Sequence, residues 1–200
     1  MTWIKTIEYR EASGKLKKLY DRIVGPKGYL DNILKIHSLR PNTLEGHLSI
    51  YKNVLHHTNN TLPKWLLEAL GVYVSHLNQC DYCFDHHFEG MRKLLNNDTR
   101  AKEIRQAIIN DRLDSVFDDE KQVLFDYAKI LTKDPGGLDI SIINNIKDRG
   151  YDDGQVLEIN QVISYFAYAN RTVSGLGVTV KGDILGLSPG DQNSKNWHHQ

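Results

Sequence analysis

The residues able to do chemistry are concentrated in one stretch, CDYCFDHH at positions 80–87, which holds both cysteines and two of the nine histidines. On a helix, Cys80, Cys83 and His87 recur at i, i+3 and i+7 and therefore share one side. His86, one position round the helix, is expected to point elsewhere. Two thiols and an imidazole are thus predicted on the inward face of one helix, together with the apolar residues Phe84, Met91, Leu94 and Leu95.

This arrangement suits thiol chemistry. A thiol reacts as its thiolate, and the start of a helix favours that form because its unpaired N–H groups and its dipole stabilise negative charge. His87 follows Cys83 by one turn and is in reach as a proton acceptor. Two cysteines three residues apart can also close a disulfide, so that one is oxidised to a sulfenic acid and the other resolves it. The stretch therefore contains the elements of a dithiol peroxidase.

Glu68 is the candidate for orienting the histidine. It lies on an otherwise apolar helix expected over residues 61–77, immediately upstream. A carboxylate that faces a buried imidazole orients it and strengthens it as a base. Glu68 also belongs to a narrow polar stripe on that helix, however, so simple exposure to solvent is an equal alternative.

The rest of the chain is predicted to be helical. Apolar residues recur with helical spacing, and no segment shows convincing strand alternation. Glycine, proline and asparagine separate the segments. An all-α single domain is expected over residues 1–187, followed by a polar tail at 188–200. Roughly seven to nine helices are expected. They are 13–24, 42–57, 61–77, 80–96, 98–110, 121–132, 140–149 and one from about 152 past 173, with a short apolar-periodic piece at 29–36.

Composition argues against several classes of function. Lys+Arg and Asp+Glu both number 25, and no basic patch with interleaved aromatic residues is present, so nucleic acid is not an expected partner. No apolar run approaches the ~18 residues of a membrane span, and the N-terminus lacks the pattern of a signal peptide. No membrane association and a cytoplasmic location are therefore expected. In a reducing compartment, a Cys-x-x-Cys pair indicates redox activity or metal binding.

Glu68, eleven intervening residues and Cys80-x-x-Cys83-x-x-x-His87 together resemble the signature of the alkylhydroperoxidase AhpD-like superfamily, which includes the carboxymuconolactone decarboxylases. Residues 65–95 resemble its core helix pair, and residues 131–180 resemble the C-terminal half of its peroxidase-related branch. The resemblance implies an AhpD-like all-helical fold, a homo-oligomer (trimer, hexamer or dimer), and no cofactor or metal.

The same resemblance implies roles for the site residues. Cys83 would attack a peroxide, and Cys80 would resolve the oxidised sulfur and meet the reductant, either a dithiol protein or a small thiol. Glu68 and His87 would relay the proton. The decarboxylase members do not use such a cysteine pair in catalysis, so the pair favours a redox function.

One position departs from the family's pattern. The best-studied peroxidases carry a second histidine just before the second cysteine, where this chain has Tyr82, and a phenol is a poor base at its usual pKa. The departure predicts a less efficient proton relay or a different substrate. Tyr82 and His76, which lies one turn before the cysteine helix, are therefore secondary candidates for the site.

Other interpretations stay open. Buried cysteines are often inert hydrophobic side chains. Cys80, Cys83 and His87 would also suit zinc, although the sequence offers no second pair of ligands. A Cys80–Cys83 disulfide that toggles assembly would make the chain a redox-sensing protein, and the decarboxylase branch suggests a lyase. The leading prediction is a thiol-dependent hydroperoxide reductase of the antioxidant type.

Overall fold

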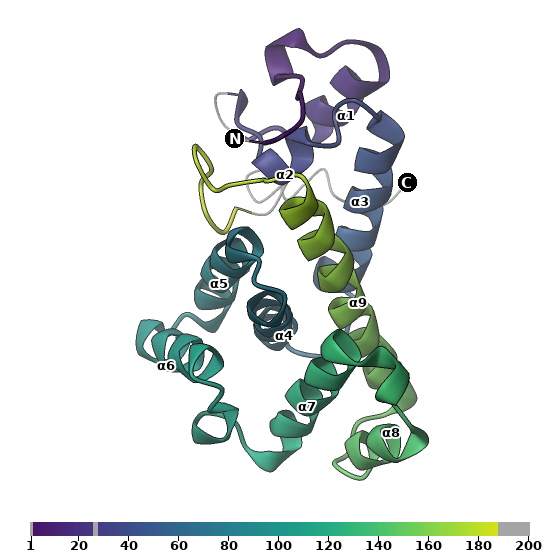
Figure 1. The fold of residues 1–200 in the computed structure, drawn as a ribbon, viewed down its shortest axis with the longest axis vertical. Coiled ribbons are helices and arrows are strands. Elements are labelled where there is room, and N and C mark those ends of the chain that lie inside the picture. The colour runs from purple at the N-terminus through teal and green to yellow at the C-terminus, as the bar shows by residue number, and fades with distance from the viewer. Residues whose placement is uncertain (1, 26–27, 188–200) are drawn as a thin grey trace.

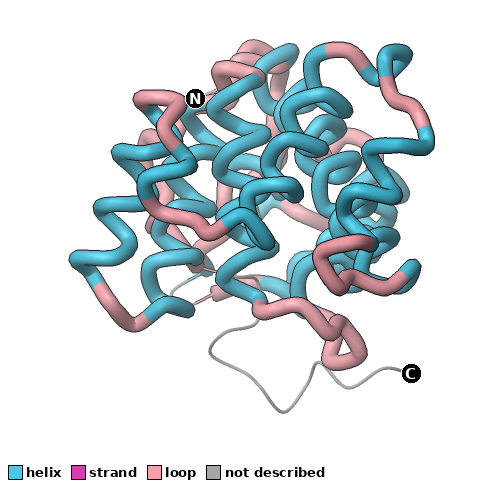
Figure 2. Tube along the Cα trace, turned by 90° about the horizontal axis from the view of Figure 1, so that it is seen from below, coloured by secondary structure: helices cyan, strands magenta, loops and turns pink. Residues whose placement is uncertain are grey.

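A computed structural model describes residues 2–25 and 28–187, and over these ranges the chain forms helices and loops without a β-strand (Figures 1 and 2). The predicted all-α class is confirmed, whereas the expected polar tail lies outside the described residues. Shorter pieces accompany the main helices. They include α2 (Asn32–Lys35), a π-helical turn at Lys52–His56 that continues α3, and 3-10 turns at Tyr9–Glu11, Leu113–Ser115 and Pro135–Gly137. The main helices are α1 Gly14–Ile23, α3 Pro41–Tyr51, α4 Lys64–Leu77, α5 Asp81–Leu95, α6 Asp98–Ile109, α7 Asp119–Lys133, α8 Ile140–Lys147 and α9 Asp153–Gly175.

Helix α4 lies at the centre, in contact with α5, α6, α7 and α9 (Figure 1). Its ten consecutive residues from Leu66 to Ser75 are all buried. A helix that is apolar almost all round requires a partner on every side, which these four helices supply. The middle of the polar stripe is buried with the rest: Glu68, Gly71 and Ser75 are buried, and Glu68 is only 3% exposed. The alternative of a solvent-exposed Glu68 is therefore wrong.

A tight connection turns the chain from α4 back into α5. Gln79 adopts a left-handed backbone conformation, with φ of 57°, and the backbone N–H of Cys80 donates a hydrogen bond to the carbonyl of Ser75 (2.9 Å). The two helices then pack closely, because a Cβ built on Gly90 of α5 would lie only 3.5 Å from the Glu68 carboxylate. Of the apolar residues expected on the inward face of α5, Leu94 is an exception, being 45% exposed.

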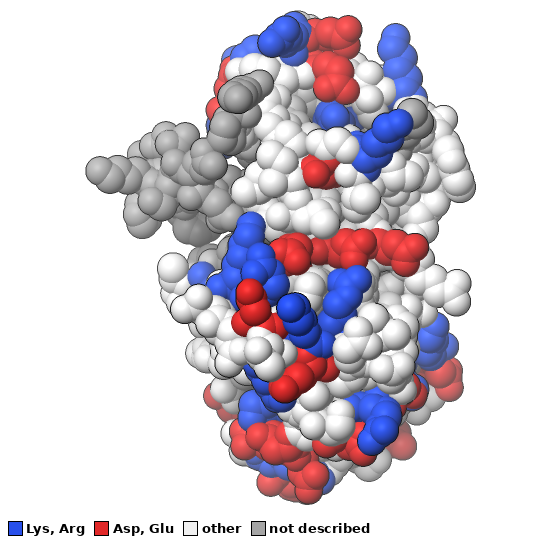
Figure 3. Space-filling model, turned by 90° about the vertical axis from the view of Figure 1, so that its left-hand side faces the viewer, with Lys and Arg blue, Asp and Glu red and all other residues white. Residues whose placement is uncertain are grey.

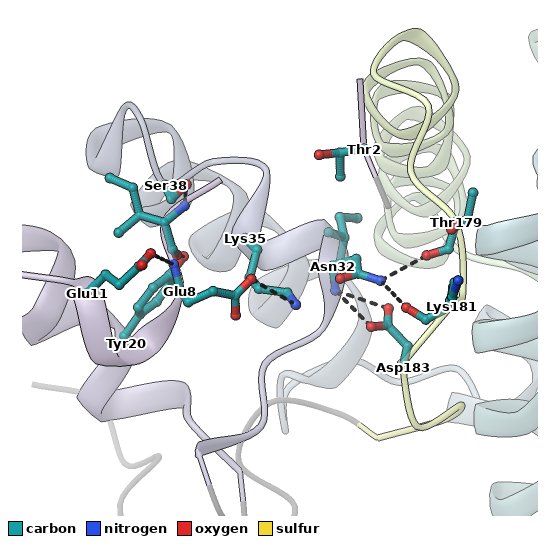
Figure 4. Close-up of polar contacts among 12 residues, drawn as sticks. Thr2, Glu8, Glu11, Tyr20, Asn32, Lys35, Ser38, Thr179, Lys181 and Asp183 are labelled. Atoms are coloured by element: carbon teal, nitrogen blue, oxygen red, sulfur yellow. Dashed lines mark hydrogen bonds and ion pairs between the residues drawn. The ribbon is translucent and has the colours of Figure 1, made fainter. Parts of the chain in front are cut away.

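The N-terminal helices α1–α3 form a separate layer with its own apolar cluster, which includes Leu16, Tyr20 and Leu44. The segment after α9, residues 176–187, runs against this layer at α2 (Figure 1). The Asn32 side chain donates hydrogen bonds to two backbone carbonyls of this segment, and the Asp183 carboxylate accepts one from the Asn32 backbone N–H (Figure 4). The contacts join the N-terminal layer to the segment that follows α9.

Charged side chains of both signs are interspersed on the face shown in Figure 3. This mixture agrees with the formal net charge of zero. Among the described residues, no helix combines the length and the apolar character needed to cross a membrane.

Candidate functional site

The two cysteines lie together at the start of α5. Cys80 is the N-cap residue and Cys83 stands in the first turn, and their Sγ atoms are 2.9 Å apart. Both are free thiols and both are buried. Their surroundings differ, because Cys83 lines an internal cavity, whereas Cys80 is not among the residues that line it. Ile36, Val173 and Val178 complete the apolar cluster around the pair.

The two thiols hold their protons unequally. The hydrogen bond between them lowers the pKa of Cys80 to about 7, and the Ser174 side chain contributes in the same direction. Burial raises the pKa of Cys83 well above its ordinary value, and the hydrogen bond to Cys80 adds to the rise. One thiolate therefore forms near neutral pH, and it rests on Cys80 while Cys83 keeps its proton.

The buried Glu68 pairs with the partly buried His87. Nδ1 of His87 lies 2.7 Å from Oε2 of Glu68. Because an ionised carboxylate only accepts, the Nδ1–H group is the donor, and Nε2 is left with the lone pair of a base. This is the arrangement in which a carboxylate fixes the tautomer and the orientation of a catalytic imidazole.

Phe166 of α9 packs against the same histidine. The two rings meet edge-on, with centroids 4.5 Å apart and planes at 76°. The ring reaches this position only because residue 71 of α4 is glycine: a Cβ at Gly71 would lie 2.1 Å from it. Gly71 therefore sets the distance between α4 and α9 beside His87.

Cys83, Glu68 and His87 face one cavity, which contains about 610 Å³ of space when its opening is included. A buried thiol, an imidazole base and an orienting carboxylate around one space suit nucleophilic attack by sulfur with proton transfer. The other side chains in its wall are largely apolar or aromatic and include Ile33, Leu34, Tyr51, Tyr165, Ala169 and Leu187.

The two secondary candidates, Tyr82 and His76, lie in different places relative to the cavity. Tyr82 lines the cavity, but its hydroxyl donates to Oδ2 of Asp183 (2.7 Å) and accepts from the backbone N–H of Ile33 (3.1 Å). Burial raises the pKa of Tyr82 well above its ordinary value, so the phenol serves as a structural tie and not as a base. His76 is not among the residues lining the cavity, and its ring packs against Phe84.

The prediction that His86 points away from the site is wrong, because His86 lines the same cavity. It stands one turn after Cys83, at i+3, and this spacing was a usable signal. Asp31 also lines the cavity, and Asp183 lies beside His86, with 3.3 Å between Oδ2 and Nε2. These two carboxylates come from opposite ends of the chain, so no local spacing in the sequence brings them together.

Comparison with known proteins identifies the fold. No family model matches the chain. It resembles the alkylhydroperoxidase AhpD core structure of an uncharacterised peroxidase-related protein from Ralstonia eutropha JMP134, with a TM-score of 0.77 and 16% identity over 89% of this chain and 91% of that one. A peroxidase-related protein from Silicibacter sp. TM1040 gives 0.76 and 20% identity over the same shares. The predicted AhpD-like fold is thereby confirmed.

Two further likenesses extend the comparison. The debrominase Bmp8, as a cysteine-to-alanine variant in complex with 2,3,4-tribromopyrrole, matches with a TM-score of 0.71 and 15% identity over 91% of this chain and 95% of that one. By sequence, a UPF0735 ACT domain-containing protein from Clostridium beijerinckii is 34% identical over 115 residues, which are 52% of this chain and 77% of that protein. The likeness by sequence covers half of the chain, so the fold assignment rests on the structures.

Proposed function

We propose that this chain, which belongs to the AhpD-like superfamily by its fold, is a thiol-dependent hydroperoxide reductase. One observation carries the proposal: two free thiols lie 2.9 Å apart, and one of them shares a cavity with the Glu68–His87 pair. The peroxidase-related structures with the same fold support the same class of chemistry.

Cys83 is the thiol assigned to attack, because it faces the cavity. Its proton passes to His87, whose Nε2 is free to accept it while Glu68 holds Nδ1. The Cys83 sulfur then bonds to one peroxide oxygen as the O–O bond breaks, which oxidises the sulfur to a sulfenic acid. The leaving alkoxide takes the proton from His87 and departs as an alcohol.

Cys80 is the resolving thiol. With its pKa lowered to about 7, a substantial fraction of Cys80 is thiolate near neutral pH. Its thiolate attacks the Cys83 sulfur, the S–O bond breaks, and the hydroxyl leaves as water after taking up a proton, which closes the Cys80–Cys83 disulfide. A dithiol protein or a small thiol then reduces the disulfide, and both thiols are restored.

The biological setting belongs to the same proposal. The domain over residues 1–187 acts as a homo-oligomeric antioxidant enzyme in the cytoplasm, with a hydroperoxide as substrate and a thiol reductant as electron donor. The site residues assigned here require no cofactor for this cycle.

The test is peroxide consumption with a dithiol reductant, comparing the wild-type chain with Cys83→Ser and Cys80→Ser. Turnover is expected to be lost in both variants, and a sulfenic acid trapped with dimedone should accumulate on Cys83 in Cys80→Ser. Full activity in Cys83→Ser overturns the proposal. A disulfide that forms with peroxide but never turns over points instead to the redox-sensing alternative.

A second candidate is thiol-dependent removal of halogen from an aromatic ring. It is favoured by the match to a debrominase that binds 2,3,4-tribromopyrrole and by the aromatic wall of the cavity. Cys83 would take bromine from the ring carbon, which gains a proton, and Cys80 would displace bromide to form the disulfide. Bromide release from 2,3,4-tribromopyrrole, dependent on both cysteines and on added dithiol, distinguishes this activity from peroxide reduction.

A further inference from the structure

We propose that Asp31, His86 and Asp183 form a binding site for a divalent transition-metal ion in the wall of the cavity. Each of the three side chains offers one ligand atom, and these atoms all lie within 4.8 Å of one another. They come from the segment before α2, from α5 and from the segment after α9. The site shares no residue with the pair of thiols or with the Glu68–His87 pair.

The first support is a buried histidine nitrogen that makes no hydrogen bond, although it lies within ion-pair distance of Asp183. The His86 side chain is only 10% exposed, and its Nε2 has no hydrogen-bond partner among the described residues. It points toward Asp183, whose Oδ2 lies 3.3 Å away. The Tyr82 ring packs against the imidazole, with ring centroids 4.5 Å apart. A buried polar atom without a partner is costly, and a neutral imidazole nitrogen so placed is a good metal ligand.

The second support is that two buried carboxyl groups, Asp31 and Asp183, have no lysine or arginine partner among the described residues. The Asp183 side chain is 1% exposed and Asp31 is 7% exposed. No described lysine or arginine forms an ion pair with either of them. Buried carboxylates require a compensating charge, and a bound cation between them supplies it.

The third support is the way neighbouring groups orient the carboxylates. The Tyr29 hydroxyl donates to Oδ1 of Asp31 (2.6 Å), which leaves the other oxygen for an ion. Asp183 accepts from the Tyr82 hydroxyl. It also accepts from the backbone N–H of Asn32 (Figure 4). Hydrogen bonds that fix the ligands from outside are characteristic of built metal sites.

The ligand set indicates the kind of ion. One imidazole nitrogen and two carboxylate oxygens favour Mn²⁺, Fe²⁺, Co²⁺ or Zn²⁺ over Ca²⁺ or Mg²⁺. Three protein ligands also leave coordination positions open. Asp31 and His86 line the cavity that Cys83 faces, so the open positions are available to a molecule bound there.

The test is direct binding to the full chain, reduced and stripped with a chelator. Titration with Co²⁺, followed by absorption, and with Zn²⁺, followed by calorimetry, should show one ion per chain. His86→Gln and Asp31→Asn each remove one of three ligands, so each should weaken binding by at least about 100-fold. His76→Gln is the matched control for a histidine outside the site, and the double variant Cys80→Ser/Cys83→Ser controls for binding by the thiols.

The experiment is independent of the peroxidase hypothesis, because it measures metal binding and not peroxide turnover. Retained affinity in His76→Gln and in the double cysteine variant, with weakened binding in the other two, supports the site. Circular dichroism checks that His86→Gln is folded, and the nearly isosteric Asp31→Asn carries the test if it is not. The proposal is overturned by three results: no stoichiometric binding, thiolate-to-Co²⁺ charge-transfer bands, or affinity unchanged in both Asp31→Asn and His86→Gln.

Discussion

Gly71 provides a sharp test of how the site is packed. In Gly71→Ala the new methyl group would lie 2.1 Å from the Phe166 ring, whereas ordinary contact begins at 3.4 Å, so ring and helix must separate by about 1.3 Å. Phe166 is fully buried and its edge already meets His87, which leaves no free direction for the ring. Overpacking of this kind costs about 1–3 kcal/mol of folding free energy.

The measurement is the melting temperature by circular dichroism. For a chain of this length, the cost corresponds to a decrease of about 2–12 °C. Gly46→Ala is the matched control, since Gly46 is also helical but exposed, with no atom within 4 Å of a Cβ built there. That change should stabilise the protein by about 0.4–1 kcal/mol through the unfolded state.

A double-mutant cycle identifies the atoms responsible. Adding Phe166→Leu to Gly71→Ala makes room for the methyl group, so the double variant should lose less stability than the two single changes together, with a coupling of about 1 kcal/mol or more. If Gly71→Ala melts at or above the wild-type temperature, as Gly46→Ala should, then the close contact between α4 and α9 is not as described and the reasoning is refuted.

Three further predictions concern ionisable groups. Thiolate absorbance should rise with a midpoint near pH 7, from Cys80, and Cys83→Ala should raise that midpoint because it removes the hydrogen bond that lowers the pKa; an unmoved midpoint contradicts this cause. Glu68→Gln should reduce the rate of peroxide consumption by about 10–150-fold, which is the free energy of one charged hydrogen bond expressed as a rate ratio. The control Glu103→Gln, at an exposed position, should leave the rate unchanged. In metal-free protein, Asp31→Asn should raise the free energy of unfolding at pH 7 by about 1–3 kcal/mol. The pKa of Asp31 in the folded protein, about 6, exceeds the ordinary 3.8, so ionisation of this group lowers the stability of the wild-type protein as the pH rises between these two values. At pH 3 the group is protonated in both states, and denaturant titrations should show no gain in stability for Asp31→Asn.

Most of the fold followed from local sequence signals. The helices end where glycine, proline or capping residues interrupt the apolar period, and the side chains of Asn97, Asp118 and Asp152 cap α6, α7 and α9. The π-helical turn at Lys52–His56 was not predicted, because its apolar spacing continues that of α3 without a break. A change from i+4 to i+5 hydrogen bonding leaves no mark on a short apolar pattern.

The polar stripe of α4 shows where periodicity alone is insufficient. A row of small and polar residues suits either solvent or a second helix, and here α9 fills it. Ser75 donates to the carbonyl of Gly71 and accepts from the side chain of Asn170, whose oxygen in turn accepts from Asn78. Asn170, the α9 residue that contacts this stripe, stands more than ninety residues later in the chain. The spacing within α4 alone therefore cannot show whether the stripe, and Glu68 with it, faces solvent or another helix.

Tyr82 replaces the second histidine of the AhpD-like pattern, and it also contacts the proposed metal site of Asp31, His86 and Asp183. A histidine at this position would offer a base beside Cys83, whereas the tyrosine hydroxyl holds the Asp183 carboxylate and the Ile33 N–H. The same contact fixes Asp183 next to His86. Under the proposed function, tyrosine at this position would leave Glu68 and His87 to move the proton. Its hydroxyl would also hold Asp183, one ligand of the proposed metal site. On this argument Tyr82→Phe should weaken Co²⁺ binding while sparing the thiolate midpoint near pH 7. A Tyr82→Phe variant that binds Co²⁺ as tightly as the wild type would separate the two features and refute the link.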